Sequence, residues 1–82
     1  MTLSQFKLLS EPYQTDILWQ SGVFIGSRNT LFYIIDLFQV EGFYVEVFYD
    51  KEQEEIKLLK SFYSPDQLIP YLNQINIRNL IE

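Results

Sequence analysis

The residues best suited to carry chemistry form one small polar group among apolar strands. Asp36 lies in the run Leu31–Val40, and the expected strand pairing places Ser21 opposite it and Lys60 one diagonal step away. Burial would raise the pKa of this carboxyl and suit it to acid/base chemistry. Buried polar groups are more often hydrogen-bonded structural features, so we expect Ser21, Asp36 and Lys60 to form a buried polar cluster. A register shifted by one residue would instead expose Asp36.

The chain is poorly equipped for other kinds of catalysis. It contains no Cys and no His, so it lacks a thiolate nucleophile, an imidazole base and the usual zinc ligands. Gly22–Gly26 is expected to be a strand and not a phosphate-binding loop. The acidic run Asp50–Glu55 lacks the spacing and the glycine of a calcium-binding EF-hand loop. We therefore expect a protein that is not an enzyme, with no catalytic, cofactor-binding or metal-binding residues.

The composition indicates a single small folded domain over residues 1–82. The 48% share of hydrophobic and 17% share of aromatic residues excludes intrinsic disorder. Because so short a chain without disulfides is marginally stable, it needs dense packing or oligomerisation. A net charge of −5 with scattered Lys and Arg argues against nucleic acid and anionic membranes as partners. No signal peptide or membrane-spanning run is recognisable, and we expect a cytoplasmic location.

The pattern of the sequence predicts an α+β fold, an antiparallel four- or five-stranded β-meander with one C-terminal helix packed on one face. Alternating apolar residues and turn signals predict strands at 17–26, 31–40, 43–49 and 55–63. Gln5–Leu9 fits either a short strand or one helical turn. Ser64-Pro65-Asp66-Gln67 has the form of a capping box, and the apolar spacing after it predicts a helix over 66–74.

Turn lengths set the expected register, and the register sorts the side chains onto two faces. A two-residue turn at Glu41-Gly42 pairs Val40 with Phe43, and similar turns at 28–29 and 52–53 extend the sheet on both sides. The face expected beneath the C-terminal helix collects the following residues: Ile17, Trp19, Val23, Ile25, Phe32, Ile34, Phe38, Val40, Phe43, Val45, Val47, Tyr49, Ile56, Leu58 and Phe62.

The opposite face is mixed, with aromatic and aliphatic residues among amides and charges, which is typical of an interface. The residues expected to form that interface are Tyr33, Ile35, Leu37, Tyr44, Glu46, Phe48 and Leu59. We therefore expect a non-enzymatic, acidic protein–protein interaction module that self-associates as a homodimer through this face. Two alternatives stay open: an inhibitor or immunity-type protein that binds a basic partner, and a small-ligand binder that uses the aromatic side chains.

Overall fold

Two helices precede four strands in the computed structural model, which describes residues 1–63. The elements in chain order are α1 (Leu3–Lys7), α2 (Glu11–Ser21), β1 (Val23–Asn29), β2 (Tyr33–Val40), β3 (Phe43–Asp50) and β4 (Glu55–Phe62). The helix predicted over 66–74 lies outside the described residues. In the part of the chain described, no helix is long and apolar enough to cross a membrane.

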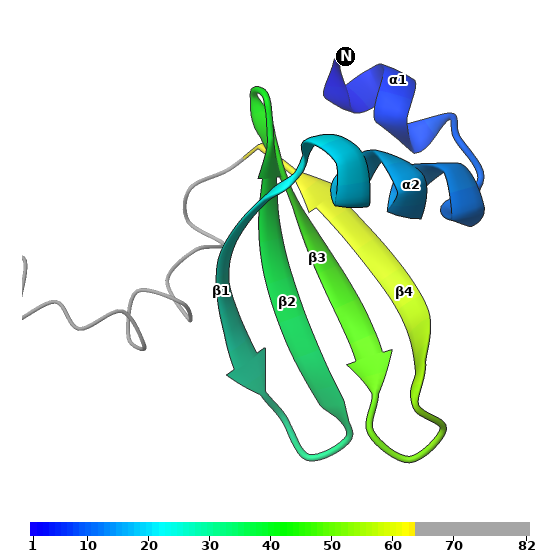
Figure 1. The fold of residues 1–82 in the computed structure, drawn as a ribbon, viewed down its shortest axis with the longest axis vertical. Coiled ribbons are helices and arrows are strands. Elements are labelled where there is room, and N and C mark those ends of the chain that lie inside the picture. Colours follow the sequence, from blue (N-terminus) through cyan, green and yellow to red (C-terminus); the bar gives the residue numbers. More distant parts are fainter. Residues whose placement is uncertain (64–82) are drawn as a thin grey trace, which may run out of the picture.

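The four strands form one antiparallel sheet in the order β1-β2-β3-β4, which confirms the predicted α+β meander. Figure 1 shows both helices lying across one end of the sheet, where β2 and β4 finish. The described helices thus come before the strands, whereas the sequence pattern predicts the covering helix after them.

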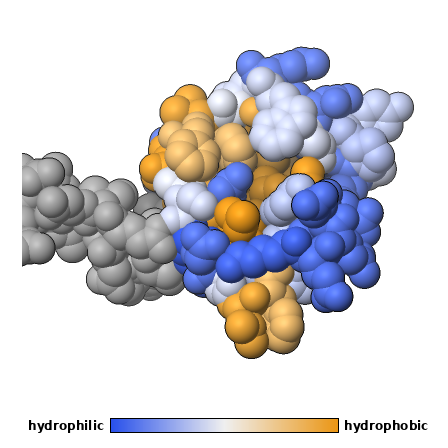
Figure 2. All heavy atoms as spheres, turned by 60° about the horizontal axis from the view of Figure 1, so that its bottom comes forward, coloured by the Kyte–Doolittle hydropathy of each residue, from blue (hydrophilic) through white to orange (hydrophobic). Residues whose placement is uncertain are grey.

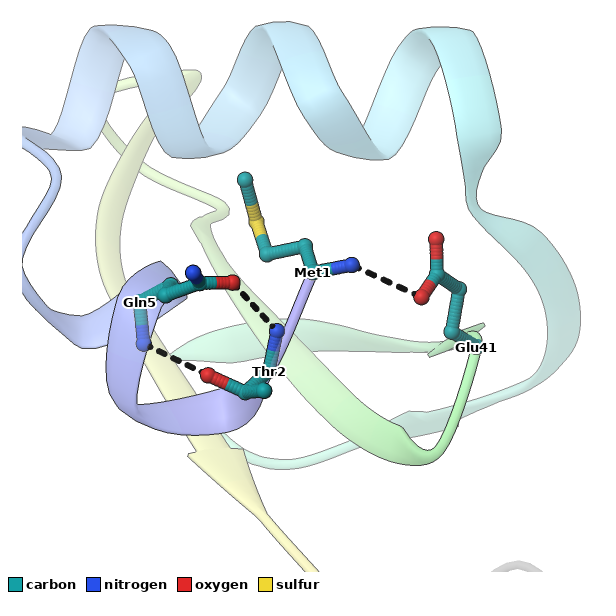
Figure 3. Close-up of polar contacts among 4 residues, drawn as sticks. All are labelled: Met1, Thr2, Gln5 and Glu41. Atoms are coloured by element: carbon teal, nitrogen blue, oxygen red, sulfur yellow. Dashed lines mark hydrogen bonds and ion pairs between the residues drawn. The ribbon is translucent and has the colours of Figure 1, made fainter.

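A capping box begins α1. The Thr2 hydroxyl accepts a hydrogen bond from the Gln5 backbone N–H at 3.1 Å, and the Gln5 side-chain oxygen accepts one from the Thr2 backbone N–H at 2.9 Å (Figure 3). These bonds satisfy two N–H groups that a helix start leaves without partners. The Met1 ammonium pairs with Glu41 Oε2 at 2.8 Å and ties this end to the β2–β3 turn (Figure 3). Of the two structures that fit residues 5–9, the helical turn is the one that forms.

The strand predicted to start at Ile17 is wrong in its first part, because residues 11–21 form α2. Pro12 lies in the first turn of the helix, where its missing N–H costs nothing. Gly22 ends the helix, and its N–H donates to the Leu18 carbonyl at 2.9 Å. A Cβ at Gly22 would lie 2.6 Å from that carbonyl oxygen, so only glycine lets the chain pass directly from helix to strand here.

The predicted register is confirmed between β2 and β3, where Val40 lies opposite Phe43 and Asp36 opposite Val47. In that turn the residue with positive φ is Glu41, at 49°, and not the neighbouring glycine. The β1–β2 register differs from the prediction, since Asp36 faces Ser27. Between β3 and β4, a register shift at Phe48 and Tyr49 displaces the pairing of β4 by one residue from the prediction.

A core lies between the helices and the sheet face beneath them. This helix-side core consists of Leu3, Phe6, Leu18, Phe38, Val40, Phe43, Val45 and Val47. Phe6 of α1 is fully buried, and the centroid of its ring lies 5.2 Å from that of Phe43, so this aromatic contact, together with buried Leu3, packs α1 against the sheet. The sheet face predicted as the core face is thus confirmed for β2 and β3, with α1 and α2 as its cover.

Phe6→Ala should therefore lower the free energy of unfolding by about 3 kcal/mol, because it leaves a cavity between α1 and the sheet. Leu8→Ala is the matched control on the same short segment, since Leu8 is 86% exposed. It should change stability by less than about 0.5 kcal/mol. Urea denaturation followed by circular dichroism measures both, and equal effects would contradict the packing described for α1.

Candidate interaction surface

The sheet face turned away from α1 and α2, here called the second face, has an apolar cluster of its own. Ile35, Leu37 and Phe62 are buried in it. Partly buried side chains pack around them: Ile25, Tyr33, Tyr44 and Phe48. Among the described residues, none from α1 or α2 belongs to this cluster. The second face is therefore an apolar sheet surface to which α1 and α2 contribute no core residue.

An ion pair lies within this apolar face. Arg28 Nη2 of β1 donates to Glu46 Oε2 of β3 at 3.2 Å, across the intervening strand β2. The Glu46 side chain is only 6% exposed and that of Arg28 is 27% exposed. Coulombic attraction is strong where water is largely excluded, but the loss of hydration opposes it. The pair thus places two charges at a defined position on the second face. It constrains the geometry of β1 and β3 there more than it adds to the free energy of unfolding.

Aromatic contacts surround the ion pair. Tyr33 and Phe48 meet edge to face with ring centroids 5.7 Å apart, and Tyr44 stacks on Phe62 at the same distance. Lys60 Nζ lies 5.9 Å from the centre of the Phe48 ring. Such contacts restrict the motion of the large rings on the second face.

The structure places six of the seven predicted interface residues on the second face. Ile35, Leu37 and Glu46 are already buried there, while Tyr33, Tyr44 and Phe48 keep part of their surface exposed. The assignment of Leu59 to this face is wrong, because its side chain packs against the helix-side core. The register shift in β4 reverses the orientation of the residues after it, so Leu58, Lys60 and Phe62 lie opposite Phe48, Glu46 and Tyr44 instead.

The predicted buried polar cluster of Ser21, Asp36 and Lys60 does not form. Ser21 is the exposed last residue of α2, because this segment is a helix and not a strand. Lys60 is exposed and lies opposite Glu46 on the second face. Asp36 is partly buried on the helix side of the sheet, opposite Ser27 and Val47. The two register differences separate three residues that the sequence pattern brings together.

Arg28 is the functional candidate that sequence reasoning missed, because the pattern places it in a turn. The spacing of the sequence offers a signal for it, because Arg28 lies two residues after Gly26 and a strand that continues to residue 29 places both on one face. In β1 they lie opposite Leu37 (Gly26) and Ile35 (Arg28).

On the outer strand β4, Lys57 Nζ lies 2.9 Å from Glu55 Oε1, and this hydrogen bond raises the pKa of Lys57 above its ordinary value. Because both groups are largely exposed, that pair contributes little to the fold.

An open pocket of about 470 Å³ lies between the β1–β2 and β3–β4 turns. Two of its polar side chains, those of Asp50 and Lys51, take part in the turns. Asp50 Oδ1 accepts the backbone N–H groups of Glu52 and Gln53, each at 2.8 Å, and Lys51 Nζ donates to the Thr30 carbonyl at 2.8 Å. Figure 2 views this end of the molecule and shows apolar patches beside a broad hydrophilic area. The hydrogen bond from Lys51 to Thr30 joins the two turns.

If the Arg28–Glu46 pair is an integral part of the second face, Glu46→Gln should lower the free energy of unfolding by about 2 kcal/mol, because the Arg28 charge stays half-buried. A double-mutant cycle with Arg28→Met should give a coupling energy of about 1 kcal/mol. The exposed pair of Lys57 and Glu55, changed to Met and Gln, is the control and should show no measurable coupling. Equal coupling in the two cycles would contradict the structural role of the buried pair.

Comparison with protein-family models, with curated proteins and with solved structures finds no match to this chain. The physical character of its surfaces is therefore the basis for a functional proposal. Among the described residues that character is an apolar, aromatic sheet face with an ion pair inside it.

Proposed function

We propose that this chain is a non-enzymatic protein-interaction module that self-associates through the second face. The observation that carries the proposal is the second apolar cluster, to which neither described helix contributes a residue. A solvated sheet face is usually polar, whereas this one presents the rings of Tyr33, Tyr44 and Phe48. Tyrosine and phenylalanine are enriched in the cores of protein interfaces.

A second copy is the occupant that fits this face best. Leu58 beside the aromatic rings is 46% exposed, and a copy related by a twofold axis would cover it together with the rings. Lys60 at the margin and the ion pair within give the face charges of both signs, which can fix the relative orientation of two copies. Association would also add apolar burial to a domain that has no disulfide.

The other candidate occupant is a segment of the same chain. The sequence predicts a helix over 66–74, and it follows β4, whose last residue Phe62 is buried in the second-face cluster. Such a helix lying on this face would remove the surface needed for association. The two arrangements differ in the mass of the particle in solution.

Light scattering of the 82-residue chain at micromolar concentration should therefore report a dimer. Leu58→Glu should convert it to a monomer, because a carboxylate would be desolvated at the interface. Leu31→Glu is the matched control, since Leu31 is 82% exposed in the β1–β2 turn, and it should leave the dimer intact. Thermal unfolding of both variants would show that they are folded.

A monomer at every concentration tested would contradict self-association and favour coverage by residues 64–82. Dissociation by Leu31→Glu as complete as that by Leu58→Glu would assign the contact to another surface. The alternative of a small ligand on the aromatic face has less support, because the pocket described above lies between the turns.

A further inference from the structure

A separate aromatic surface lies on the helix side of the sheet, near the edge formed by β1. Trp19 of α2 and Phe24 of β1 both pack against Phe38 of β2, with ring centroids 5.5 and 5.7 Å from it. Phe38 is 8% exposed, whereas Trp19 is 58% and Phe24 56% exposed. We call these three residues the aromatic patch. Single exposed apolar residues are ordinary, but two large rings from different elements that share one buried ring form a continuous apolar surface.

Carboxylates border this patch. Asp36 lies two residues before Phe38 in β2, so both side chains are on the same side of the sheet. Asp16 precedes Trp19 by about one turn on the same face of α2. Within residues 1–63, the ion pairs join Met1 to Glu41, Arg28 to Glu46 and Lys57 to Glu55. Neither Asp16 nor Asp36 belongs to any of these pairs, so no cation of residues 1–63 lies within ion-pair distance of either carboxylate. The patch therefore combines exposed aromatic rings with two bordering carboxylates.

We infer that the aromatic patch binds an arginine side chain on a basic partner protein, with the guanidinium group lying against the exposed rings and hydrogen-bonded to Asp36. A cation is attracted to the face of an aromatic ring, most strongly to that of tryptophan. Arginine suits this surface better than lysine, because its planar group stacks on rings and can donate two parallel hydrogen bonds to a carboxylate. The net charge of −5 attracts a basic partner at long range and repels nucleic acid.

This inference does not depend on the proposed self-association. The aromatic patch lies on the helix side of the sheet and the dimer contact on the second face. A dimer formed through the second face would carry two aromatic patches, one on each copy, and a monomer would carry one.

Trp19 is the one tryptophan in the chain, so its fluorescence reports on this surface alone. The 82-residue chain is titrated with the peptide acetyl-Arg-Gly-Arg-amide, and with the same peptide in which neutral citrulline replaces each arginine. The arginine peptide should change the Trp19 emission in a saturable way. The citrulline peptide has nearly the same shape without the charge, and it should bind about tenfold more weakly or not at all.

Asp36→Asn should weaken binding of the arginine peptide about fivefold, since it removes the charged acceptor beside the rings. Glu52→Gln removes the same charge at the distant β3–β4 turn and should change the affinity less than about twofold. Phe24→Leu should also weaken binding, and because Phe24 is largely exposed it keeps the test decisive if Asp36→Asn does not fold. Equal weakening by Asp36→Asn and Glu52→Gln, equal binding of the citrulline peptide, or no emission change would each overturn the site.

Discussion

Strand β3 sends apolar side chains to both faces of the sheet, and much of the structure follows from the need to cover both. Val45 and Val47 point into the helix-side core, while Tyr44 and Phe48 point to the second face. A sheet that is apolar on one face needs one cover, but this sheet needs two. The helices α1 and α2 supply the first through Leu3, Phe6 and Leu18, a small set of contacts at one end of the sheet. The proposed self-association would supply the second cover, on the second face.

The sequence allowed the centre of the fold to be predicted because local rules there agree with the tertiary contacts. The two-residue turn before Phe43 fixes the β2–β3 register, and alternation in both strands then assigns their faces. The outer strands were harder, since a single extra residue reverses a face. The shift between Phe48 and Tyr49 moved Leu59 to the helix side, and no turn signal marks it.

The wrong prediction of a strand from residue 17, where α2 forms, has a different physical cause. Ile17, Trp19 and Ser21 alternate with Leu18, Gln20 and Gly22, a pattern that resembles a strand, whereas in the helix only Leu18 is buried. Because the sheet covers so little of this helix, its sequence lacks a clear apolar stripe. The local signals were Pro12 in the first turn and the serine before Glu11, both typical of a helix start. Once residues 11–21 are helical, Ser21 cannot face Asp36, and the predicted polar cluster has no basis.

The two surfaces differ in the kind of partner they suit. The second face is apolar with an internal ion pair, and it suits a copy of itself, while the aromatic patch carries negative charge at its border and suits a cation. The proposed basic partner and the proposed second copy would therefore bind to opposite faces of the sheet. The main proposal is that the two faces of the sheet bind different partners.

Nuclear Overhauser effects between isotope-labelled and unlabelled copies, mixed in one sample, test that claim most directly. Self-association through the second face predicts intermolecular effects between the Leu58 methyl groups of one copy and the Tyr44 and Phe48 rings of the other. It also predicts none that involve Trp19 or Phe24. Effects from Leu58 only to residues of its own chain, in a particle of monomer size, would contradict it.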